Sequence, residues 1–190
     1  FLPLDPKARS TSTSTSTSTS TSPHRVAVVG PMQVNHVARL GMVPNYDSHT
    51  SRVGAWHVAS TALRESFLWD AVRVKGNAYG AMCSFDHITG VIGMASYRDP
   101  RLSETLNDFA AAPSWIRSLN TEAKEALLQK AVLSTIGKID APGSPARKAS
   151  INTDRFIAGT SHEMVQKRRE EVLSTSPADL DDFASAVEQA

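Results

Sequence analysis

The chain has 190 residues, a formal net charge of +1 and an ordinary globular composition, with 41% hydrophobic and 21% charged residues. The balanced charge, with no long basic run, argues against a dedicated nucleic-acid surface, and no apolar stretch approaches the roughly 18 residues of a membrane span. Cys83 is the single cysteine, which excludes an internal disulfide and a cysteine-based metal site; its apolar neighbours predict a buried, inert thiol.

The first part of the chain predicts a linker. Residues 10–22 alternate strictly between Ser and Thr, and such a tract has no apolar side chains to bury. We therefore expect 1–9 to end a preceding segment, 10–23 to be a disordered linker, and 24–190 to form one domain. Modification of the hydroxyl groups is the functional alternative for the tract. The chain begins with Phe1, so we expect it to be a piece of a longer product.

Strand patterns follow, with one helix between them. Residues 26–29 form a β-branched run before Gly30 and predict a buried strand; 33–39 predict a second strand that ends before Gly41. From residue 52 the apolar spacing becomes helical, to about residue 69 or a little beyond. Residues 81–85 and 91–97 flank a short connection that contains Gly90, which is typical of a hairpin.

The remainder of the chain predicts helices over 102–119, 121–139, 145–158, 162–173 and 177–188. Three Asp-Pro or Ser-Pro pairs give start signals, at Asp99, Ser144 and Ser176. Thr160 with Glu163 fits a capping box. The order of elements predicts an α+β fold, in which helices pack on one face of a mainly antiparallel sheet.

The six histidines do not form a zinc-peptidase motif. Such motifs place two His and one Glu within about one helical turn. The nearest approach begins at His162, where Gln166 stands in place of the second His. The sequence also lacks a serine-hydrolase elbow, a glycine-rich phosphate loop and a CxxC pair. We expect no catalytic residue and no metal ligand in this chain.

The segment 72–80 combines polar side chains with two glycines. If it is extended, Arg73 and Tyr79 point to one face because their spacing is even. The alternative is a helix that ends near Val74, a turn at Gly76-Asn77 and a strand that opens at Tyr79. Both arrangements can present Arg73 and Tyr79 to the same cleft.

Several short sequence motifs, in the same order along the chain, give a family resemblance from about residue 26 to residue 190. They are Gln33-Val34-Asn35, Leu68-Trp69-Asp70 leading to Arg73, Ala78-Tyr79-Gly80, Ser84-Phe85-Asp86, Gly90-Val91, Ser96-Tyr97-Arg98-Asp99-Pro100, Ile136-Gly137, Ile139-Asp140, Arg168-Arg169-Glu170-Glu171 and Leu173-Ser174-Thr175-Ser176. These motifs resemble those of the last domain of the presequence proteases, a family of pitrilysin-like zinc metallopeptidases.

The resemblance implies four related α+β domains, in two halves that close around a chamber where short peptides are degraded. It implies a zinc cofactor in the full-length enzyme, bound by an HxxEH helix of the first domain and not by this chain. The substrate-binding residues implied here are Arg73 and Tyr79. The implied partners are a peptide substrate and the N-terminal peptidase half, with no nucleic acid and no membrane, and the implied location is the mitochondrial matrix or the chloroplast stroma.

Two points stay open. Asn77 stands where relatives commonly have Gly, so the turn must tolerate left-handed backbone at an Asn. The chain could also be a non-catalytic structural or interaction module of the same fold, which an upstream reading frame with or without HxxEH distinguishes. In either case we expect the chain alone to be inactive and to expose an apolar face where another domain docks.

Overall fold

The computed structural model describes residues 26–31, 33–47 and 52–190. The chain divides into two compact units, 1–31 and 32–190, and each is treated by itself. The predicted linker at 10–23 lies outside the described residues. In the first unit, residues 26–31 carry no regular secondary structure, and Val26, Val28 and Val29 are 87–94% exposed. The prediction of a buried strand at 26–29 is therefore wrong, because the described part of this unit offers no strand to pair with.

The second unit contains a three-stranded antiparallel sheet in the order β1-β3-β2. Its strands are β1 (Asn35–Met42), β2 (Gly80–Asp86) and β3 (Val91–Asp99). The predicted hairpin of β2 and β3 is confirmed. Its turn is closed by Asp86, whose carboxylate accepts hydrogen bonds from the Ile88 amide and the Thr89 hydroxyl, and by Gly90 at φ +72°.

β1 continues through Gly41, where the sequence predicted an end. Gly41 pairs with Ile92 of β3, so the ladder is not interrupted there. A Cβ at Gly41 would overlap the backbone of Ala190, the last residue of the chain. The glycine therefore allows a close approach to the C-terminus and does not break the strand.

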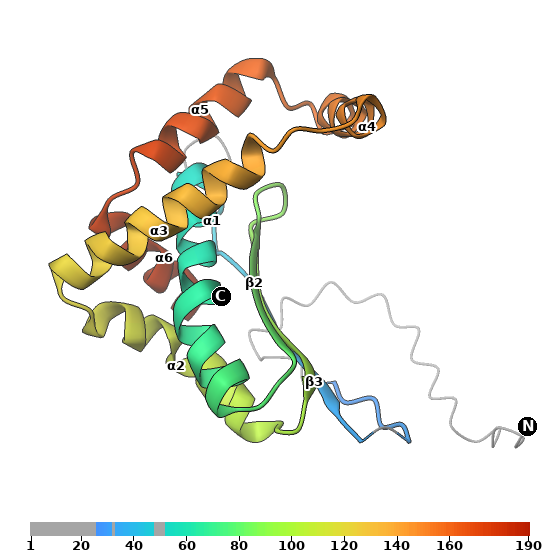
Figure 1. The fold of residues 1–190 in the computed structure, drawn as a ribbon, viewed down its shortest axis with the longest axis vertical. Helices are drawn as coiled ribbons and strands as arrows, with labels where there is room; N and C mark the ends of the chain where they lie inside the picture. Colours follow the sequence, from blue (N-terminus) through green and yellow to red (C-terminus); the bar gives the residue numbers. More distant parts are fainter. Residues whose placement is uncertain (1–25, 32, 48–51) are drawn as a thin grey trace, which may run out of the picture. The chain divides into compact units, whose positions relative to one another are not determined.

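Helices cover one face of this sheet, which confirms the predicted α+β fold (Figure 1). The predicted helix beginning near residue 52 is α1 (Val53–Leu63), which continues without a break into η2 (Arg64–Lys75), a wider helix with i→i+5 hydrogen bonding. It extends beyond residue 69 because Leu68 and Val72 are fully buried and keep the later turns on the core. The other helices are α2 (Ser103–Ser118), α3 (Thr121–Ile139), α4 (Pro145–Ile157), α5 (His162–Leu173) and α6 (Pro177–Gln189).

The predicted caps are partly confirmed. Ser144 accepts a hydrogen bond from the Arg147 amide at the start of α4, and Ser176 forms a capping box with Asp179 at α6. At α5 the cap is Ser161, one residue after the predicted Thr160. At α2 the prediction is wrong, because the buried Asp99 carboxylate accepts from the Arg101 amide and the Thr105 hydroxyl while the helix begins at Ser103.

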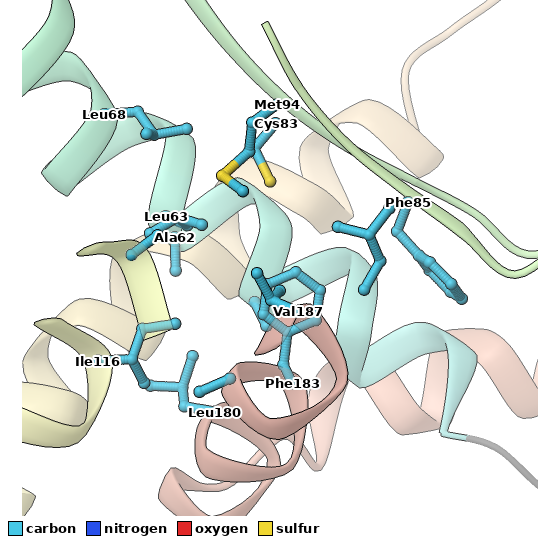
Figure 2. Packing of buried hydrophobic residues seen from close by; sticks show 14 of the residues in the cluster. Ala62, Leu63, Leu68, Cys83, Phe85, Met94, Ile116, Leu180, Phe183 and Val187 are labelled. Carbon is cyan, nitrogen blue, oxygen red and sulfur yellow. The ribbon is translucent and has the colours of Figure 1, made fainter. Parts of the chain in front are cut away.

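The core lies between the sheet and the helices (Figure 2). Leu63 of α1, Ile116 of α2 and Phe183 of α6 meet the side chains that β2 and β3 direct inward, among them Cys83 and Met94. Burial raises the pKa of the Cys83 thiol to about 12, which is consistent with the predicted inert cysteine. None of the helices in the described part of the chain has both the length and the apolar character that a membrane crossing needs.

Apolar side chains are exposed in several places in this unit, and two of these places are α4 and the outer face of the sheet. α4 has no buried residue, and its Phe156 and Ile157 are 86% and 77% exposed. The second place is the outer face of the sheet, where Leu40, Met82 and Tyr97 are exposed. The sheet face carries Tyr97, whose ring contacts that of the candidate residue Tyr79.

Candidate functional site

Arg73 and Tyr79 lie on either side of the turn that leads from η2 into the sheet. Arg73 is in the last turn of η2, and Tyr79 is the residue immediately before β2. The turn passes through Gly76 and Asn77, and the Ala78 amide donates a hydrogen bond of 3.1 Å to the Val72 carbonyl. The structure therefore has the helix–turn–strand arrangement, and the extended arrangement of 72–80 is wrong.

Asn77, which stands where relatives commonly have Gly, adopts the left-handed backbone conformation expected at this turn, with φ +59°. Asn enters this region more readily than other residues with a side chain, because its short amide can interact locally with the backbone. The turn thus keeps its geometry without a glycine at this position.

A half-buried cation fixes the end of η2 beside the turn. The Arg101 guanidinium donates to the Ala71 carbonyl at 3.1 Å and pairs with Asp108 at 2.9 Å. It lies so close to Gly76 that a Cβ there would overlap it. A cation at the C-terminal end of a helix also interacts favourably with the exposed carbonyls. Arg101 therefore holds in place the turn that carries both candidate residues.

The Arg73 side chain lies on the surface, stacked on an aromatic ring. Its guanidinium carbon is 4.0 Å from the centroid of the Trp69 ring, and Trp69 itself is 46% exposed. A guanidinium over an indole face is a favourable cation–π pair, which restrains the planar donor group without using its N–H groups. Those N–H groups form no hydrogen bond or ion pair with the residues that the structure describes, so they remain available to a ligand.

Tyr79 is anchored by its backbone and leaves its phenol in solvent. Its amide donates to the carbonyls of Tyr97 and Arg98, at 3.0 and 3.3 Å. Its ring meets the Tyr97 ring edge-on, with centroids 5.9 Å apart and an interplanar angle of 71°. The side chain is 66% exposed, and within the described ranges its hydroxyl has no hydrogen-bond partner. The phenol is therefore a free donor.

Two neighbours of these residues, Trp69 and Tyr97, were not predicted from the sequence as part of the site. The i,i+4 spacing of Trp69 and Arg73 could have indicated their contact. Tyr97 could not have been paired with Tyr79 without the β2–β3 register, in which Gly80 lies opposite Tyr97. No hydrogen bond or aromatic contact joins Arg73 and Tyr79 in the part of the chain that the structure describes. An open groove of about 550 Å³ is elsewhere, lined by α3 side chains with Leu173 and Pro177.

A second polar cluster joins the hairpin turn to the helices. Arg168 of α5 lies 2.8 Å from the Nε2 atom of His87, and the Tyr46 hydroxyl donates to the His87 carbonyl. Arginine has only donors, so Nε2 of His87 must accept and the ring must be neutral. The His57 ring lies 5.7 Å from His87, and burial lowers the pKa of His57 to about 4. This cluster connects four parts of the fold: the β2–β3 turn, the segment after β1, α1 and α5.

The same cluster does not form a metal centre. Over the described residues, no group of three or more His, Cys, Asp or Glu side chains could hold a metal ion. His162 and Gln166, the nearest approach to a zinc motif in the sequence, both lie on the exposed surface of α5.

Comparison with known proteins gives one family. A family model described as the PreP C-terminal domain matches residues 25–190. Presequence protease 1, chloroplastic/mitochondrial, of Arabidopsis thaliana is 38% identical over 85% of this chain, and Protein HypA of Clostridium perfringens is 33% identical over 81% of it. The mitochondrial presequence protease of Xenopus laevis is 34% identical over 65% of it. The chain spans only 11–15% of the length of these relatives.

The fold has a counterpart among solved structures. The crystal structure of a proposed zinc protease from Bordetella pertussis Tohama I matches 78% of this chain and 84% of its own chain, with a TM-score of 0.57 and 17% identity. At this identity the match establishes the shared α+β fold.

Proposed function

This chain belongs to the presequence protease family, as its C-terminal domain, and we propose that it supplies substrate contacts to a zinc endopeptidase that degrades presequences and other short unstructured peptides. The observation that carries the proposal is the pair of exposed, unengaged donors at the entrance to β2. The Arg73 guanidinium stacks on the Trp69 ring and the Tyr79 ring contacts Tyr97, while neither the guanidinium nor the Tyr79 hydroxyl has a polar partner among the described residues.

The chemistry of the two donors fits peptide hydrolysis. Attack on a peptide carbonyl builds negative charge on its oxygen, and a phenol that donates a hydrogen bond stabilises that charge in a site from which water is excluded. The planar guanidinium of Arg73 can donate two parallel hydrogen bonds to backbone carbonyls or to a carboxylate. Tyr79 would therefore act at the scissile carbonyl, and Arg73 would hold the peptide beside it.

The zinc of the proposed enzyme would be bound outside this chain. The described residues offer no group able to hold it, so no step of the proposal passes through a metal ligated here. The proposed partners are the peptide substrate and an N-terminal peptidase half. Because the two donors would reach the peptide only when the halves close, turnover would depend on closure.

The domain boundary and the location belong to the same proposal. The family match begins at residue 25, which supports a boundary after the Ser/Thr tract, near residue 24. The names of the plant and animal relatives support the mitochondrial matrix or the chloroplast stroma, whereas the Clostridium relative indicates that the family also occurs in bacteria. Fractionation of cells that express a tagged full-length protein tests the location.

The test of the function is Tyr79→Phe in the full-length enzyme. Loss of one donor to a developing oxyanion should lower kcat roughly 10²–10³-fold. The zinc content should stay the same because the ligands would lie elsewhere. Arg73→Lys, which keeps the charge and loses the planar fork, should raise KM. Met82→Leu, an exposed change on the same sheet face, is the matched control.

Unchanged turnover in Tyr79→Phe would contradict the assigned role. In that case a non-catalytic structural or interaction module becomes the better description of the domain. A loss of turnover that comes with a loss of zinc would also contradict it, since the effect would then be on the metal site.

A further inference from the structure

We propose that Tyr97 is a positioning residue, which orients the Tyr79 phenol from the neighbouring strand. The inference rests on the proposed role of Tyr79 and adds to it the element that restrains its side chain. Tyr97 makes no contact with substrate in this account; it acts only through the Tyr79 ring.

The starting point is the freedom of the Tyr79 side chain. Its residue is 66% exposed and its hydroxyl has no partner in the described part of the molecule, so hydrogen bonding does not fix the phenol. The ring contact that it does have is the edge-on contact with Tyr97, at 5.9 Å between centroids. Perpendicular aromatic pairs are favoured by the charge distribution of the rings, so this contact selects one orientation of the Tyr79 ring. Without it the side chain would be free to sample its other rotamers.

Tyr97 can restrain its neighbour because its own ring is held from other sides. The His36 ring of β1 packs against it with centroids 4.9 Å apart, and the Arg98 guanidinium lies 5.6 Å from its centroid. His36, Tyr97 and Tyr79 thus form a row of three rings across the open face of the sheet, which we call the aromatic row. The hydroxyls of Tyr97 and Tyr79 both lack a hydrogen-bond partner among the described residues, and Tyr79 is the ring of the row that directly follows the helix and turn carrying Arg73.

A bulge in β3 sets the direction of Tyr97. Asn35 pairs with Asp99 and Val37 with Ser96, so two residues of β3, Tyr97 and Arg98, stand opposite one residue of β1. Arg98 has a φ of +49°, a conformation that costs energy for a residue with a side chain. Bulges of this kind bend a strand and change the direction of a side chain, and they are frequent beside active sites.

The surroundings keep this strained conformation in place. Before the bulge, Ser96 is paired to both neighbouring strands. After it, Asp99 is fully buried and is held by hydrogen bonds from the Arg101 amide and the Thr105 hydroxyl. Strained backbone persists where neighbouring structure fixes it on both sides, and such sites are often functional. The anchored bulge therefore presents Tyr97 to Tyr79 in a constant position.

A purely structural role for Tyr97 would require it to pack into the core, and it does not. Ile92, Met94 and Ser96 are buried residues of β3 that face the helices, whereas Tyr97 is 40% exposed and belongs to the alternate, open face. The helices cover the opposite face (Figure 1). Removing the ring should thus leave no cavity in the core.

The experiment is a double-mutant cycle in the full-length enzyme. Tyr97→Leu should lower kcat roughly two- to twelvefold, the range expected for the loss of one aromatic pair, with little change in KM. In a Tyr79→Phe background the same substitution should change kcat less than about twofold, because the phenol that it positions is gone. Tyr97→Phe keeps the ring and should restore most of the activity.

A second measurement covers the case in which Tyr97→Leu does not fold. The 190-residue chain contains three tyrosines, so ¹³C labelling of tyrosine gives a spectrum that Tyr79→Phe and Tyr97→Phe assign. We expect a nuclear Overhauser contact between the Tyr79 and Tyr97 rings in the unsubstituted chain. The absence of this contact would overturn the inference.

The outcomes separate the two proposals. Equal losses from Tyr97→Leu in both backgrounds, or failure of Tyr97→Phe to restore activity, would overturn the positioning role and leave the function of Tyr79 standing. Unchanged turnover in Tyr79→Phe alone would overturn the proposed function, and the inference that rests on it.

Discussion

The partly buried position of His57, at the centre of α1, predicts how far the free energy of unfolding falls at acid pH. His57 is partly buried, packs on the Phe85 ring at 5.5 Å, and faces His87 and Arg168. Burial first, and then these two neighbours, lower the pKa of His57 from 6.5 to about 4, while Asp86 opposes the effect only in part. The folded chain therefore keeps His57 neutral at a pH where the unfolded chain protonates it.

The sign and the size of the effect follow from linkage. Well above pH 6.5 the ring is neutral in both states, so His57 has no effect on the pH dependence there. As the pH falls from 6.5 towards 4, only the unfolded chain binds the proton, and the free energy of unfolding falls with it. A pKa lowered from 6.5 to about 4 corresponds to a loss of up to about 3 kcal/mol. That is a large share of the 5–15 kcal/mol by which domains are usually stable.

The assay is urea denaturation of the chain between pH 7.5 and pH 4.5. His57→Gln cannot titrate, so the gap between its free energy of unfolding and that of the unsubstituted chain should change by up to about 3 kcal/mol across this range. His162→Gln, at an exposed position in the first turn of α5, is the matched control and should follow the unsubstituted chain. Parallel curves for His57→Gln and the unsubstituted chain would refute the reasoning, since burial would then not disfavour the charged ring.

Two further predictions concern the backbone. Asn77→Val should lower the free energy of unfolding by about 1–2 kcal/mol, because φ +59° suits Asn but not a β-branched residue. Asn77→Gly should leave the free energy of unfolding within about 1 kcal/mol of that of the unsubstituted chain. Equal stability of the two variants would contradict the left-handed turn. Gly54→Ala should lower the free energy of unfolding, measured by urea denaturation, by about 1–3 kcal/mol. The added Cβ would overlap the Arg168 carbonyl and force α1 away from α5. In the unsubstituted chain the Gly54 amide donates a hydrogen bond of 2.8 Å to the Glu171 carboxylate at this contact. A Gly54→Ala chain as stable as the original would show that the two helices can separate without cost.

Local patterns predicted most of the helical part. The bounds of α3 and α5 agree with the predicted ranges, and those of α4 and α6 differ by one residue at the C-terminal end, because their start and stop signals act within one turn of helix. The same local reasoning failed at Asp99, where the predicted N-cap is instead buried and bonded to Thr105. An Asp before a Pro can cap a helix or bond deeper in the fold, and only its surroundings decide which.

The sequence by itself determined the family and the α+β class, because these depend on short motifs and on apolar periodicity among neighbouring residues. It also predicted the two residues of the candidate site, through the family resemblance. It could not determine that Arg73 stacks on Trp69 while Tyr79 meets Tyr97, or that Arg98 takes a left-handed conformation in a bulge. Those features depend on the register of β3 against its two neighbours, which is fixed by contacts between residues far apart in the chain. The tertiary structure therefore decided how the two donors are held.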